Sequence, residues 1–113
     1  MKAISVSLLV AAGLLSAGVA QAADESALAK QKGCLACHAP DKKVVGPAYG
    51  WIAKKYTAAD TAKLAEKVQK GGGGVWAKQL GAAIPMPANN VTPDEAKRLV
   101  TWLLSLPKLD YPK

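Results

Sequence analysis

The chain carries the stretch Cys34-Leu35-Ala36-Cys37-His38, directly after Gly33, and this motif contains both cysteines and the only histidine of its 113 residues. Two thiols about one helical turn apart can add to the two vinyl groups of a haem, and the residue that follows then presents its imidazole to the iron. The spacing therefore predicts one covalent haem c, attached through Cys34 and Cys37 and ligated by His38.

Other uses of these cysteines explain less. A structural zinc site needs about four ligands, more than this chain offers in Cys and His. A redox-active disulfide would be expected near a βαβ pattern, and the sequence shows no alternating strand pattern. A simple structural disulfide between Cys34 and Cys37 stays open, but it would leave His38 without a role.

The second axial ligand follows by elimination. His38 is the only histidine, so a bis-histidine haem is excluded, and Met86 is the only methionine besides Met1. A methionine in a small core is ordinarily a gap-filler, but Met86 stands between Pro85 and Pro87, which restrict its backbone. We therefore predict His38 and Met86 as the iron ligands, a pairing known for haem iron.

Two strong protein ligands leave the iron no open position for oxygen, peroxide or substrate, and a thioether ligand raises the reduction potential. The sequence thus predicts an electron carrier and not an enzyme, with no catalytic residue. The alternative is a small haem peroxidase or a ligand-binding haem domain, which would require Met86 to be absent from the iron.

Residues 1–22 have the layout of a secretory signal peptide. Lys2 gives a positive start, residues 4–19 form an apolar run, and Ala20-Gln21-Ala22 is a small-x-small cleavage pattern. An uncleaved membrane anchor is the alternative, but the strongest apolar core, residues 6–15, is short for a membrane span. We expect cleavage after Ala22 and a periplasmic protein without stable membrane insertion.

The mature domain would cover residues 23–113, near the lower limit of chains that fold alone. The sequence contains no Phe, three Trp and three Tyr, so a core this poor in large side chains needs another filler, such as a haem. The formal net charge is +7. Since an exported protein does not meet nucleic acid, we expect acidic redox proteins as partners, although scattered lysines fit a merely solvated surface equally well.

The remaining sequence predicts an all-α domain of about four short helices. Three of them are expected over residues 24–32, 48–56 and 57–70. A last helix begins after Thr92, which forms a capping box with Glu95, and Pro107 ends it. The four glycines at 71–74 end the third helix, and residues 76–91 show little periodicity.

These features together resemble the short class I bacterial cytochromes c, which are soluble monohaem carriers of respiratory and denitrifying chains. The resemblance covers nearly all of residues 23–113. It is carried by Lys32 to His38, Val45 to Tyr49, Gly74 to Trp76, Ile84 to Pro87 and the last helix with Trp102. It implies a class I cytochrome c fold around the haem, with the first and last helices crossed, and a monomer serving cytochrome donors and terminal reductases or oxidases.

The resemblance also implies roles for four residues near the haem. The Pro47 carbonyl would accept a hydrogen bond from the His38 ring and orient it. Trp76 would bind a haem propionate or fill the core, and Lys67 would bind a propionate or remain solvated. Asn89 would bind the methionine sulfur or serve as a turn residue.

Residues 78–83 are an addition relative to the shortest members of that family, and they put the role of Trp76 most in doubt. By the same resemblance, electrons would pass through a partly exposed haem edge. The resemblance implies an apolar docking patch around this edge, formed by Leu35, Val44, Pro87 and Ala88. We further expect Lys42, Lys43 and Lys78 at the rim of this patch, where they would attract acidic partners.

Overall fold

The computed structural model describes residues 23–81 and 84–112. The predicted signal peptide, residues 1–22, lies outside the described residues. The helical elements in chain order are α2 (Ser26–Gln31), η2 (Cys34–Ala36), α3 (Tyr49–Lys55), η3 (Ala58–Asp60), α4 (Thr61–Lys70), α5 (Ala77–Leu80) and α6 (Pro93–Leu104). Within the described ranges, β structure is limited to two isolated bridges. The all-α prediction is confirmed.

Helix α6 supplies more buried apolar side chains to the described core than any other helix. It begins with the predicted capping box, in which the Glu95 N–H donates to Thr92 Oγ1 and the Thr92 N–H donates to Glu95 Oε1, both at 3.0 Å. These bonds satisfy amides that a helix start leaves unpaired. Its buried side chains follow helical spacing and are Ala96, Leu99, Val100, Trp102 and Leu103.

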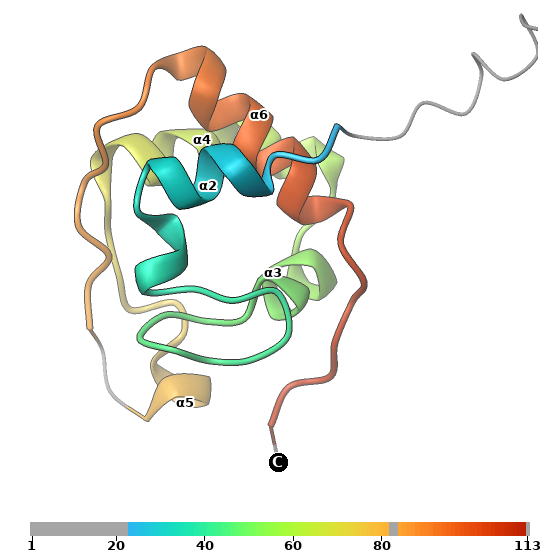
Figure 1. Ribbon diagram of the computed structural model, residues 1–113. Coiled ribbons are helices and arrows are strands. Elements are labelled where there is room, and N and C mark those ends of the chain that lie inside the picture. The colour runs from blue at the N-terminus through green and yellow to red at the C-terminus, as the bar shows by residue number, and fades with distance from the viewer. Residues whose placement is uncertain (1–22, 82–83, 113) are drawn as a thin grey trace, which may run out of the picture.

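Helices α2, α3 and α4 all pack against α6, and Figure 1 shows α2, α4 and α6 in the upper part of the molecule, with α3 and α5 below them. Ala29 of α2 is fully buried in one cluster with Trp102 and Leu103, as expected for crossed first and last helices. Ala65 of α4 packs against Ala96 in a second cluster. Small side chains at both contacts let the helix axes approach closely.

Two parts of the helix prediction need correction. Residues 57–70 do not form one helix, because Thr57 and Asp60 make a second capping box and the chain passes through η3 before α4 begins. The segment 76–91, predicted without a helix, contains the single turn α5. Gly81 ends that turn in the left-handed conformation at φ +75°.

After α6 the chain runs back across α3. The Leu109 N–H donates to the Gly50 carbonyl at 3.0 Å, and a Cβ on Gly50 would lie 2.5 Å from Leu109 Cγ. Lys54 and Asp110 add an exposed ion pair at 2.7 Å. The tail thus holds α3 in place. Across the described residues, no helix has the length and apolar character needed to cross a bilayer.

Candidate functional site

The Cys-x-x-Cys-His motif forms a tight turn at the edge of a cavity. Gly33 ends α2 in the left-handed conformation at φ +80°, and Cys34 to Ala36 then make the 3₁₀ turn η2. The His38 N–H closes the turn on the Cys34 carbonyl at 3.0 Å. Both cysteines are half-buried free thiols, and burial raises the pKa of the Cys34 thiol.

The His38 ring is held in one tautomer. Its Nδ1 lies 2.8 Å from the Pro47 carbonyl oxygen, the contact that the resemblance implied. Because a carbonyl oxygen can only accept, Nδ1 carries the proton and Nε2 presents a free lone pair. Burial lowers the pKa of His38, which favours this neutral form, and the bond to Pro47 opposes the shift only in part.

The loop between His38 and Pro47 fixes this geometry through its backbone. The N–H groups of Val45 and Gly46 both donate to the Cys37 carbonyl, at 3.1 and 2.7 Å. Gly46 also leaves room for the imidazole, since a Cβ there would lie 2.6 Å from His38 Cε1. Position 46 therefore requires glycine because a side chain would collide with the His38 ring.

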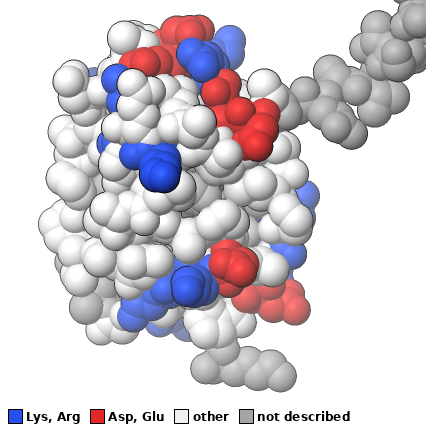
Figure 2. Space-filling model, in the orientation of Figure 1, with Lys and Arg blue, Asp and Glu red and all other residues white. Residues whose placement is uncertain are grey.

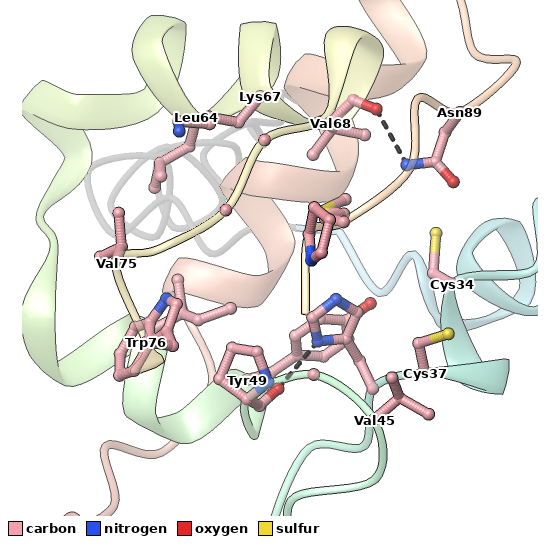
Figure 3. Close-up of a pocket in the computed structure, with 18 of the residues that line it drawn as sticks. Cys34, Cys37, Val45, Tyr49, Leu64, Lys67, Val68, Val75, Trp76 and Asn89 are labelled. Carbon is pink, nitrogen blue, oxygen red and sulfur yellow. Dashed lines mark hydrogen bonds between the residues drawn. The ribbon is translucent and has the colours of Figure 1, made fainter. Parts of the chain in front are cut away.

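The motif opens onto a cavity of about 360 Å³ in the centre of the molecule, a size typical of small-molecule sites. Figure 3 shows Cys34 and Cys37 at one end of this cavity, Val75 and Trp76 at the other, and Leu64, Lys67 and Val68 of α4 along one side. The described lining contains the lysines 63 and 67 and no Asp or Glu.

Met86 joins the same cavity from the loop between α5 and α6. It is half-buried, and its backbone pairs with Gly72 in an isolated antiparallel bridge. The cavity thus gathers two thiols, one imidazole nitrogen with a free lone pair and one thioether sulfur within an otherwise apolar wall. This set of donors fits a covalently attached haem with nitrogen and sulfur axial ligands.

The other three predicted site residues, Lys67, Trp76 and Asn89, all line the cavity and make different contacts. Trp76 packs against Trp51, with 6.4 Å between ring centroids, and against Tyr111, edge-on at 6.0 Å. Lys67 is half-buried. For Trp76, propionate binding and core filling both remain to be tested. For Lys67, the same holds for propionate binding and solvation.

The Asn89 side chain does not bind the Met86 sulfur here. Its Nδ2 group donates to the Val68 carbonyl at 2.9 Å and to the Pro87 carbonyl at 3.3 Å. An amide nitrogen has two protons, so both donors are used. The side chain therefore ties the Met86 loop to α4, which corresponds to the alternative role as a turn residue.

The predicted docking patch is only partly at the surface. Val44, Pro87 and Ala88 are exposed, but Leu35 packs against the buried cluster that contains Trp102. Among residues 23–81 and 84–112, the exposed large apolar side chains are Val44, Val45, Val75 and Ile84. Three of these, Val45, Val75 and Ile84, border the cavity and were not part of the prediction.

Tyr49 belongs to the site, although the sequence did not predict a role for it there. Its ring stacks on His38, with centroids 5.0 Å apart and planes 20° apart, and burial raises the pKa of its hydroxyl. The position of Tyr49 two residues after Pro47, in a chain with only three tyrosines, was the available signal. Nothing in the local pattern indicates which ring the phenol contacts.

Comparison with known proteins gives consistent matches. The family model for cytochrome c matches residues 22–107. Cytochrome c2 of Rhodocyclus tenuis is 72% identical over 91 residues, which cover 79% of this chain and 99% of that protein. Cytochrome c-551 of Pseudomonas aeruginosa is 46% identical over 107 residues, 93% of this chain and 98% of the relative.

Among solved structures, wild-type Nitrosomonas europaea cytochrome c552 is similar with a TM-score of 0.65 and 44% identity. The alignment covers 72% of this chain and 98% of that one. The similarity therefore extends over nearly the whole length of a solved relative.

Proposed function

This chain belongs to the cytochrome c family, as a class I monohaem c-type cytochrome that carries electrons, and we propose that its iron is ligated by His38 and Met86. The two cysteines of the motif would form the thioether bonds to the haem. When bound, the haem supplies a one-electron ferric/ferrous couple. The observation that carries the proposal is the His38–Pro47 bond at 2.8 Å, which leaves Nε2 free beside a cavity that Met86 also lines.

The protein holds the His38 imidazole in a fixed orientation, so the ring does not need to move during electron transfer. The Pro47 carbonyl keeps the proton on Nδ1, and the Tyr49 ring limits rotation of the imidazole. A hydrogen bond of this kind also raises the basicity of the ligating nitrogen. Because these contacts orient the ring in advance, the ligand suits a carrier that must gain and lose an electron with little movement.

Whether Met86 binds the iron decides whether the haem site serves electron transfer or catalysis. A thioether bound to the iron would close the site to oxygen, peroxide and other small ligands. We therefore assign no catalytic residue.

We further propose that Lys67 faces the haem carboxylates, because the described cavity lining contains lysines and no acidic side chain to pair with them.

Residues 1–22 are proposed to be a signal peptide cleaved after Ala22, which would release residues 23–113 as a monomer in the periplasm. The motif layout supports this, because small-x-small residues follow an apolar run. The positive net charge supports partners with acidic docking surfaces. Intact mass and a pyridine haemochrome spectrum of the periplasmic protein would test cleavage and haem attachment together.

The test of Met86 is the ferric spectrum of the purified holoprotein. We expect a thioether-to-iron charge-transfer band that disappears in Met86→Ala, while Met86→Leu loses the band but keeps more of the packing. A wild-type protein without this band, or a Met86→Ala variant that keeps it, would contradict ligation by Met86. It would instead favour the ligand-binding alternative.

A further inference from the structure

The glycines at 71–74 do more than end α4. The Gly72 N–H donates to the Met86 carbonyl at 3.0 Å, and the Met86 N–H donates to the Gly72 carbonyl at 2.7 Å. Both backbone polar groups of Met86 are therefore bound to a single glycine. These bonds fix the position of the Met86 backbone without any contribution from its side chain.

The glycine stretch is itself attached to the core. It continues directly from α4, where the Gly71 N–H donates to the Lys67 carbonyl at 2.7 Å. Helix α4 is buried through Ala65, which packs on Ala96 of α6. A displacement of the stretch would therefore have to unwind the end of a packed helix, so the stretch is a firm support for the Met86 loop.

The glycines differ in what a side chain would meet. At Gly73 a Cβ would lie 2.8 Å from Pro85 Cα, closer than Cβ atoms come in folded proteins, and 3.2 Å from Pro85 Cβ, which is a tight contact. Gly73 is absent from the described glycines with positive φ, so no left-handed backbone conformation requires a glycine there. Gly74 is the opposite case, because its φ is +92° but a Cβ there would have no atom within 4 Å.

We propose that Gly73 is a positioning residue for Met86: its missing side chain lets the backbone of Pro85 approach, and this sets where the next residue lies. The proposal rests on the proposed ligation of the iron by Met86. A methyl group at 73 must push Pro85 away or bend the glycine stretch, and either movement strains the bridge between Gly72 and Met86. The loop would then hold its sulfur less firmly at the iron.

The test compares Gly73→Ala with Gly74→Ala in the ferric holoprotein. Imidazole is added as the probe, because it competes with Met86 for the iron and its apparent affinity reports how firmly the sulfur is held. We expect Gly73→Ala to bind imidazole about tenfold more tightly than wild type, as overpacking against backbone is costly. Gly74→Ala adds left-handed strain without the contact, so its imidazole affinity should stay within about twofold of wild type.

The unfolding free energy and the thioether band, measured on the same samples, separate the possible results. An increase in imidazole affinity for Gly73→Ala alone supports the proposal. No increase, or an equal increase in Gly74→Ala, overturns it, because the stretch would then act only through the general stability of the fold. A wild-type protein without the thioether band would instead refute ligation by Met86 itself, and the role of Gly73 with it.

Discussion

The phenol ring of Tyr49 lies stacked on the imidazole of His38, with 5.0 Å between the ring centroids and 20° between the planes. The same phenol meets the indole of Trp102 edge-on at 5.6 Å. Tyr49 is 4% exposed and is the first residue of α3, and Trp102 belongs to α6. An aromatic chain thus connects the proposed iron ligand to the central helix of the core.

We expect Tyr49→Leu to lower the free energy of unfolding of the holoprotein by about 2–4 kcal/mol, because a buried ring and two aromatic contacts are lost. Urea titration followed by far-UV circular dichroism measures this. Tyr111→Leu is the matched control, since Tyr111 contacts Trp76 and not His38, and it should cost less. A loss below about 1 kcal/mol for Tyr49→Leu would show that the stacking contributes little.

Gly46→Ala tests the space beside the His38 ring. The new methyl group would stand 2.6 Å from Cε1 and 3.0 Å from Nδ1, so the ring must move away from the Pro47 carbonyl. We expect destabilisation by about 1–3 kcal/mol and a smaller fraction of chains with attached haem, measured by haemochrome absorbance per mole of protein.

Gly81→Ala is the control for Gly46→Ala. At Gly81 a Cβ meets no atom within 4 Å although φ is +75°, so this variant carries backbone strain without a clash at His38. Equal haem content in both variants, with equal stability, would remove the ring contact as the reason for glycine at position 46.

Features encoded in one short window could be predicted from the sequence. The start of α6 follows from the capping box of Thr92 and Glu95, whereas the helix ends at Leu104, before the predicted stop at Pro107. The Cys-x-x-Cys-His motif similarly contains its own spacing. Such signals depend on local backbone geometry, so tertiary packing has little opportunity to override them.

Contacts between distant segments could not be predicted in the same way. The bridge between Gly72 and Met86 joins backbone groups, which are the same for every residue, so the sequence contains no signal for their pairing. The stacking of Tyr49 on His38 depends on how the loop before α3 closes. Helix α5 was missed because a single turn is too short for hydrophobic periodicity to be visible.

The capping box of α6 predicts a dependence of stability on pH. The hydrogen bond from the Thr92 N–H, with a smaller contribution from Lys32, lowers the pKa of Glu95 below its ordinary 4.5. The carboxylate therefore stabilises the folded state above pH 4.5, and this contribution is lost as the pH falls through the lower folded pKa. Glu95→Gln keeps an acceptor but removes the charge, so its unfolding free energy should fall less on acidification.

Urea titrations at a series of pH values from 7 to about 3 measure this difference between wild type and Glu95→Gln. Glu66→Gln is the control, because Glu66 forms an exposed ion pair with Lys70 of the same helix. If wild type and Glu95→Gln lose stability in parallel over the whole range, the capping carboxylate does not link folding to protonation.

The last prediction concerns the surface around the cavity. On the face in Figure 2, charged side chains lie mostly toward the upper and lower parts, with a broad uncharged area between them. Lys43 is exposed beside Val44 and Val45, and its Nζ approaches the Leu80 carbonyl at 3.4 Å. Leu80 lines the cavity, so this ammonium group lies near the cavity and should attract anionic redox partners.

Anionic ferricyanide, which oxidises the ferrous protein in stopped-flow experiments, is a suitable probe of this attraction. We expect Lys43→Glu to slow the reaction about two- to fivefold at low salt, with the difference disappearing near 1 M salt as the charges are screened. Lys30→Glu makes the same change of net charge at an exposed position of α2, away from the cavity lining, and should slow the reaction less. Equal rates for the two variants would show that net charge alone governs association, and Lys43 would then have no special place in docking.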